Sequence, residues 1–142
     1  MELVRRNTGY GLRALVHMAT GSADDSFTAE DLAEAAETTV EFMHKILQDL
    51  RHAGIVASKR GPHGGFRLVT GPGQVSLLAV VEALQGPLTV NRCVMGLDIC
   101  HRAETCPLRP TWVKVQRDME QALSDTTLAD IVGVHEVSRA KS

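Results

Sequence analysis

The sequence predicts a mainly α-helical protein, a winged helix-turn-helix with a small β-hairpin wing and a long C-terminal helix. Three observations lead to this fold class. Two short segments with helical periodicity are separated by only about three residues. A glycine-rich, basic segment that alternates like a β-hairpin follows them directly. A further apolar stripe at helical spacing lies near the C-terminus.

Length and composition are those of one ordinary globular domain with a short appendage. The chain has 142 residues, of which 44% are hydrophobic and 23% are charged. This composition is sufficient to form a hydrophobic core and argues against disorder. The N-terminus shows no signal-peptide pattern, and no apolar run approaches about 18 residues. We therefore expect a cytoplasmic protein with no membrane partner. The net charge of −2 argues against a surface coated with positive charge, but local phosphate contacts need only a few lysines and arginines.

Two helices are predicted in the first forty residues. The first covers Thr8 to Ala19, where apolar residues recur on one face. The second begins after Thr28, which can cap a helix while Asp31 answers it in a variant of the capping box. Its buried face is supplied by Leu32, Ala33 and Ala36.

A third helix follows a tight break at 37–39 and makes the second half of the helix-turn-helix pair. The 3.6-residue period predicts that Phe42, Met43 and Ile46 are buried. Gly54 stands where a helix C-terminus favours a left-handed residue. In such a pair the second helix enters the major groove of DNA and reads base edges with its first turns.

The segment 55–70 is predicted to be the hairpin, because apolar residues alternate on both sides of a glycine-rich turn. Basic residues surround this tip, and Arg60 is well placed to enter a narrow minor groove. On the recognition helix, Glu41 suits the amino group of cytosine, while Thr39 and Lys45 suit phosphate oxygens. The candidate DNA-binding residues are Thr38, Thr39, Glu41, His44, Lys45, Lys59, Arg60 and His63. The alternative is a winged helix used only for protein contacts, which the basic tip disfavours.

The second half of the chain contains three more predicted helices. One spans 75–86 with Ser76 as its cap, one spans 110–123 with Pro110 at its start, and a short one spans 126–132. The long helix carries one apolar stripe, formed by Trp112, Val115, Met119 and Leu123. We expect a DNA-binding domain at 1–72, a second part at 73–134, and a flexible tail at 135–142.

All three cysteines lie in one loop, at Cys93, Cys100 and Cys106, with the spacing C-x6-C-x5-C. A single zinc ion usually shows closely spaced cysteine pairs, so the long gaps favour thiolates wrapped around a larger iron–sulfur cluster. His101 and Glu104 lie inside the loop and are candidates for a further ligand. The alternatives are a zinc site that includes His101, three cysteines without a metal, and a thiol switch. An electron carrier or enzyme would usually need a fourth cysteine or a second cofactor site, so we expect no enzymatic activity.

Three features together resemble the Rrf-two family of bacterial transcription regulators, of the IscR, NsrR and RirA type. They are TGYGLRALVHMA, the stretch TAEDLAEAAETTVEFMHKILQDLRHAGIVASKRGPHGGFRLV, and three cysteines before a final long helix; the resemblance covers about residues 1–132. It implies a homodimer whose long C-terminal helices cross, with the apolar stripe in the dimerisation contact. It also implies that the three cysteines hold a [2Fe–2S] or [4Fe–4S] cluster near the dimer interface. The positions that match the family's DNA contacts are Thr39, Glu41, His44, Lys45 and Arg60.

Two positions depart from the family pattern of cluster ligands. IscR-type members have a histidine ligand three residues after the last cysteine, where this chain has Arg109. NsrR-type members can use a carboxylate from the partner's first helix, where this chain has Gly9. The candidates for the fourth ligand are therefore His101, Glu104, Asn7 or an exogenous small ligand.

The expected function is that of a homodimeric transcription regulator, a repressor, that binds a double-stranded DNA operator. It is expected to sense redox state, nitric oxide or iron through the iron–sulfur cluster. The alternative is a winged-helix regulator or scaffold with a zinc site or no metal in the cysteine loop.

Overall fold

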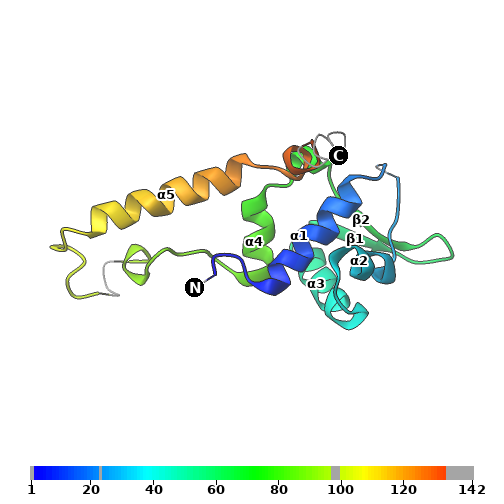
Figure 1. Ribbon diagram of the computed structural model, residues 1–142, viewed down its shortest axis with the longest axis horizontal. Coiled ribbons are helices and arrows are strands. Elements are labelled where there is room, and N and C mark those ends of the chain that lie inside the picture. The colour runs from blue at the N-terminus through cyan, green and yellow to red at the C-terminus, as the bar shows by residue number, and fades with distance from the viewer. Residues whose placement is uncertain (1, 23, 97–99, 134–142) are drawn as a thin grey trace.

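The computed structural model describes residues 2–22, 24–96 and 100–133, and the expected tail at 135–142 lies outside them. Within the described residues the fold is mainly helical, with one two-stranded antiparallel sheet (Figure 1). The mainly α fold with a hairpin wing and a long C-terminal helix is confirmed. The elements are α1 (Arg6–Ala19), α2 (Ala29–Ala36), α3 (Val40–His52), β1 (Val56–Lys59), β2 (Gly65–Leu68), η1 (Pro72–Gln74), α4 (Leu77–Gln85), η2 (Arg92–Val94) and α5 (Arg109–Asp125).

Helix α1 begins two residues before the predicted start at Thr8 because a residue far along the chain holds its first turn. The side-chain oxygen of Gln85 accepts hydrogen bonds from the Arg5 amide at 3.0 Å and the Thr8 hydroxyl at 2.7 Å. Its amide nitrogen donates to the Leu3 carbonyl at 2.9 Å. Thr8 is therefore a buried residue inside the helix rather than its first residue.

The helix-turn-helix pair forms as its local sequence signals predict. Thr28 and Asp31 make the reciprocal capping box of α2. The turn to α3 passes through Glu37, whose φ of 59° places it in the left-handed region. At the end of α3, Gly54 has a φ of 76°, and the Ile55 amide donates to the Leu50 carbonyl at 3.0 Å. This is the Schellman arrangement that the glycine predicted.

The hairpin is anchored to the loop before α2. In its register, Val56 pairs with Leu68 and Lys59 pairs with Gly65. An isolated bridge pairs Phe27 with Phe66 of β2 through two backbone hydrogen bonds, at 2.9 and 2.7 Å. The base of the wing is thereby fixed to the body of the domain, which limits how far the tip can swing.

The core lies where α1, α2, α3 and α4 meet, and it is closed by a final helical turn at 128–133. This turn is the short helix expected at 126–132. Ser76 caps α4 as predicted, and the Leu77 amide donates to the Thr126 carbonyl at 2.8 Å. The largest fully buried side chains are Leu15, Leu32, Met43, Leu47, Leu50, Leu128, Val56, Val80, Val81 and Thr8.

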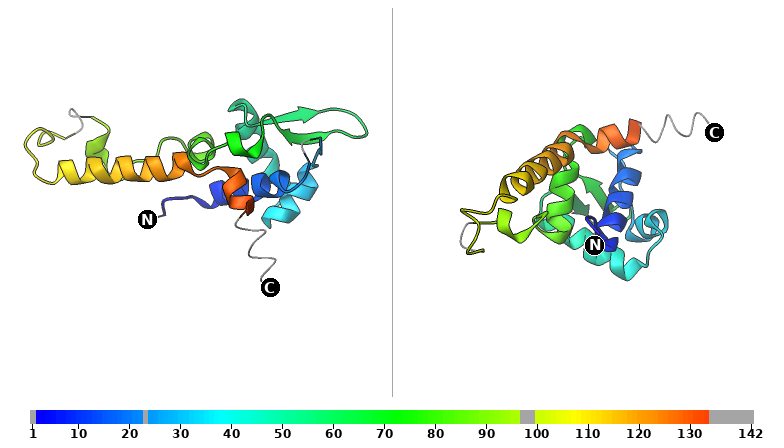
Figure 2. Two further views of the ribbon diagram at one scale, coloured as in Figure 1. Left: turned by 90° about the horizontal axis from the view of Figure 1, so that it is seen from above. Right: turned by 60° about the vertical axis from the view of Figure 1, so that its left-hand side comes forward.

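Helix α5 departs from this body. It has 17 residues, all described by the structure, and none of them is buried. Its neighbours are α4 and η2. The cysteine loop and the wing hairpin lie at opposite ends of the molecule, as two directions of view agree (Figures 1 and 2). Among the described residues, no helix is long and apolar enough to cross a membrane.

Candidate nucleic-acid interface and cysteine loop

The start of α3 presents the predicted reading residues to the outside. Glu41, His44 and Lys45 are all exposed. Thr39 is the N-cap, since its hydroxyl oxygen accepts a hydrogen bond from the Phe42 amide at 3.2 Å. The proton of that hydroxyl stays available for a phosphate oxygen. Thr38 is half-buried, and its amide donates to the Ala33 carbonyl at 3.0 Å, so it mainly shapes the turn.

The prediction that Phe42 is buried is wrong. Phe42 is 49% exposed, whereas Met43 and Ile46 are buried as expected. The periodicity placed Phe42 at the edge of the apolar stripe, but the described neighbouring elements cover that edge only in part. A large aromatic side chain therefore lies on the exposed side of the recognition helix.

The wing tip carries the predicted basic residues in exposed positions. Lys59, Arg60 and His63 are all exposed. The tip is closed by a hydrogen bond from the Gly64 amide to the Gly61 carbonyl at 2.9 Å. A Cβ atom at Gly64 would overlap the carbonyl oxygen of Lys59, so this turn admits only glycine at that position. Gly64 thus permits a tight turn, and in this turn Lys59, Arg60 and His63 lie at the surface.

A groove of about 230 Å³ separates α3 from the hairpin. Its two walls are the recognition helix and the wing, the two elements that are expected to contact DNA. Arg51 donates to the Gln48 side chain at 3.2 Å on this side of α3. The lining residues are His44, Leu47, Gln48, Arg51, Ser58 and Phe66. Gln48, Arg51 and Ser58 are not among the residues predicted from the sequence, although Gln48 and Arg51 share one helix face with His44 by their spacing.

In the cysteine loop all three thiols are free and half-buried. Arg109, the first residue of α5, links two of the cysteine segments. Its guanidinium donates to the Cys93 carbonyl at 3.3 Å, and its amide donates to the Cys106 carbonyl, also at 3.3 Å. The Cys100 carbonyl accepts from the amide of buried Ala103 at 3.0 Å. The loop is thus tied by its backbone to the start of α5.

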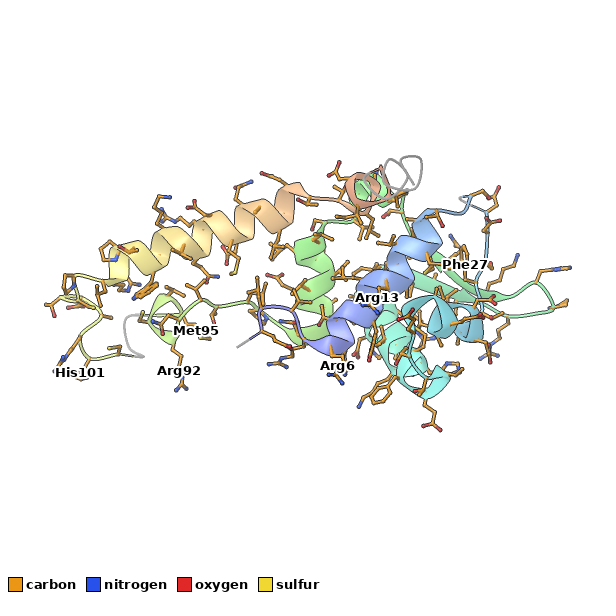
Figure 3. All side chains as sticks on the ribbon, in the orientation of Figure 1. Arg6, Arg13, Phe27, Arg92, Met95 and His101 are labelled. Carbon is orange, nitrogen blue, oxygen red and sulfur yellow. The ribbon has the colours of Figure 1, made fainter. Side chains whose placement is uncertain are left out.

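The three cysteines have the right chemistry for an iron–sulfur cluster, because such clusters are held by cysteine thiolates. Their positions do not form an assembled metal site: among the described residues, no group of three His, Cys, Asp or Glu side chains is close enough to hold a metal ion. His101 and Glu104 are both exposed. Figure 3 shows His101 projecting at the outer end of the loop, away from Met95, the residue that follows η2. His101 follows Cys100 directly in the chain, but among the described residues it does not join two of the cysteines in a group that could hold a metal ion.

The predicted dimerisation stripe on α5 is partly solvent-exposed. Trp112 is 37% exposed and Val115 is 41% exposed, while Met119 and Leu123 are half-buried. Beside the stripe, Gln116 fastens α5 to the preceding linker. It accepts from the Val90 amide at 2.9 Å and donates to the Leu88 carbonyl at 2.7 Å.

These features coincide with a family match over nearly the whole chain. Residues 4–133 match the sequence profile of Rrf2, described as an iron-dependent transcriptional regulator. The chain belongs to the Rrf2 family. This is the Rrf-two family that the sequence resembles, and it is a family of transcription regulators rather than enzymes. The expected winged-helix, DNA-binding regulator is confirmed at this level.

Individual relatives agree with this assignment. A helix-turn-helix transcriptional regulator of Mycobacterium tuberculosis H37Rv is 32% identical over 124 residues, which are 87% of this chain and 77% of that protein. Two solved structures share the fold. CymR, the global cysteine regulator of B. subtilis, superposes with a TM-score of 0.78 at 22% identity, covering 94% of this chain and 98% of CymR. IscR of T. potens superposes with a TM-score of 0.76 at 24% identity, covering 95% of this chain and 89% of IscR.

Proposed function

We propose that this Rrf2-family protein is a cytoplasmic homodimeric repressor that binds a palindromic DNA operator and responds to redox state, nitric oxide or iron. The response would pass through an iron–sulfur cluster held by Cys93, Cys100 and Cys106. The observation that carries the proposal is the set of three free, half-buried thiols in the loop tied to the first residue of α5. Residues 1–72 would bind DNA, and residues 73–134 would sense and dimerise.

The DNA-binding part of the proposal rests on exposed residues of two elements. Glu41 at the start of α3 is suited to accept a hydrogen bond from cytosine in the major groove. Lys45 and the Thr39 hydroxyl are suited to phosphate oxygens, and they would set the register. Arg60 at the exposed wing tip would enter the adjacent minor groove. The groove between α3 and the hairpin would then lie over the sugar–phosphate backbone.

The dimer part rests on α5. Helix α5 has 17 residues, none of them buried, and the described part of the chain covers its apolar stripe only in part. Exposed aromatic and aliphatic side chains on one helix face are typical of a partner surface. Because the cysteine loop is tied to the start of α5, a dimer formed along this helix would place both loops near the interface.

The cluster, when bound, supplies a tie between the cysteine segments that oxidants, nitric oxide or iron loss can break. What the chain itself contributes is a series of polar links that runs from the loop to α1, which packs against the recognition helix α3. Arg109 links the Cys93 segment to α5, and Gln116 links α5 to the linker. Gln85 then links the end of α4 to the start of α1. A change in the loop would therefore shift the population of α5 orientations, and with it the spacing of the two recognition helices.

Anaerobic purification followed by an absorbance spectrum and analysis of iron and sulfide tests the sensing proposal. We expect a coloured protein with near-stoichiometric iron and sulfide that loses its colour in Cys93→Ala. Ser124→Ala, at an exposed α5 position, is the matched control and should keep the colour. One zinc per chain, or no metal, would refute the cluster and favour the alternative of a regulator or scaffold without it. A genomic selection with the same protein tests operator binding separately.

A further inference from the structure

We propose that Phe42 is a specificity-determining residue of the DNA interface and that it contacts the 5-methyl group of a thymine in the major groove. The inference rests on the proposed operator binding and adds a base-reading residue to it. It starts from the one large aromatic side chain that α3 leaves exposed, at 49% of its surface.

The position of Phe42 on α3 is that of a reading residue. Successive residues of a helix are about 100° apart, which puts Glu41 and Lys45 near the middle of the exposed face. Phe42 and His44 then lie on its two flanks. His44 borders the groove toward the hairpin, so Phe42 lies on the flank away from the wing. The four residues cover the width of the helix face that would enter the groove.

The backbone that carries the Phe42 side chain is fixed by its surroundings. Its amide is bound by the Thr39 hydroxyl at the helix start. The next residue, Met43, is fully buried, and Ile46 one turn later is 3% exposed. These anchors fix the backbone of the first turn, so the phenyl ring is presented from a rigid element.

The chemistry of the groove identifies the contact. Thymine is the base that presents a methyl group in the major groove, and phenylalanine is one of the side chains that contact it. A phenyl ring has no hydrogen bond to offer to the polar edges of adenine, guanine or cytosine. Glu41, the neighbouring residue, is suited to cytosine. The adjacent pair would therefore read one apolar and one polar base edge side by side.

Replacement of thymine by deoxyuridine tests the contact because it removes only the methyl group. Operator duplexes from the genomic selection are synthesised with each thymine replaced in turn, and Kd is measured by fluorescence anisotropy at fixed salt with the full chain. We expect about fourfold weaker binding at one position of each half-site, the effect of losing one buried methyl group. In Phe42→Ala this difference between thymine and deoxyuridine should vanish at that position. In the control Lys45→Ala it should persist although overall affinity falls.

Two results would overturn the inference while leaving operator binding intact. One is parent protein that binds the operator but shows no position sensitive to the methyl group. The other is Phe42→Ala that keeps the same sensitivity as the parent. Because Phe42 is half exposed, the alanine variant should fold, and Phe42→Leu, which keeps an apolar side chain, should retain part of the discrimination. Failure of the parent to select any duplex would instead refute the proposed function itself, and the inference with it.

Discussion

Replacing Gln85 by alanine tests whether the link between α4 and the first turn of α1 stabilises the domain. The change removes three hydrogen bonds, to Leu3, Arg5 and Thr8. Thr8 is only 1% exposed, so its hydroxyl would lose its partner in a dry environment, at a cost of about 1–3 kcal/mol. The two backbone groups lie near solvent and can turn to water, which limits their loss to about 0.5 kcal/mol each. We therefore expect the free energy of unfolding to fall by about 2–4 kcal/mol.

The assay is urea unfolding followed by circular dichroism, at one protein concentration because a dimer's stability depends on it. Gln121→Ala is the matched control, since that exposed glutamine makes one hydrogen bond within α5. It should cost at most about 0.5 kcal/mol. The double variant Gln85→Leu with Thr8→Val should recover most of the loss, because replacing both polar partners removes the unsatisfied hydroxyl. If Gln85→Ala loses no more than the control does, the link is not stabilising and the reasoning fails.

Three further variants test the wing and the proposed dimerisation role of α5. Arg60→Ala should weaken operator binding about tenfold and reduce the slope of log affinity against log salt concentration by about 1. An unchanged slope would exclude a contact of Arg60 with the phosphates or the minor groove. Gly64→Ala forces a clash with the Lys59 carbonyl oxygen. It should lower the affinity for DNA and reduce the free energy of unfolding by about 1–3 kcal/mol. The control Gly71→Ala places its Cβ atom in open space and should change neither quantity. Trp112→Asp should weaken the dimer by at least about 2 kcal/mol in light scattering, while Gln121→Asp, about 180° around the helix, should leave it intact.

Local chemistry was enough to predict most of the elements. The reciprocal cap of Thr28 and Asp31, the cap at Ser76 and the left-handed Gly54 are all properties of a few neighbouring residues. Such signals depend on backbone groups that must find partners within one turn, so they can be read from the sequence. The exposed Glu41 also followed from the helical period.

Long-range contacts account for what the sequence did not reveal. The early start of α1 depends on Gln85, about eighty residues away, and no pattern in the neighbouring sequence predicts this contact. The bridge between Phe27 and Phe66 joins the wing to a loop for the same reason. The exposure of Phe42 was missed because periodicity identifies a stripe but cannot tell whether a neighbour covers its edge.

The sequence by itself determined the class of this protein, a mainly α winged helix of the Rrf2 family. It also determined that basic residues lie at a glycine-rich wing tip and that the three cysteines lie in one loop. These follow from residue identity and spacing, which act over a few residues. Only the tertiary structure decided which surfaces remain free. It left the stripe of α5 without a buried residue and Phe42 half exposed on α3. It also placed Arg109 between two cysteine segments. The physical reason is that burial depends on which distant elements pack together, and packing is a property of the whole chain.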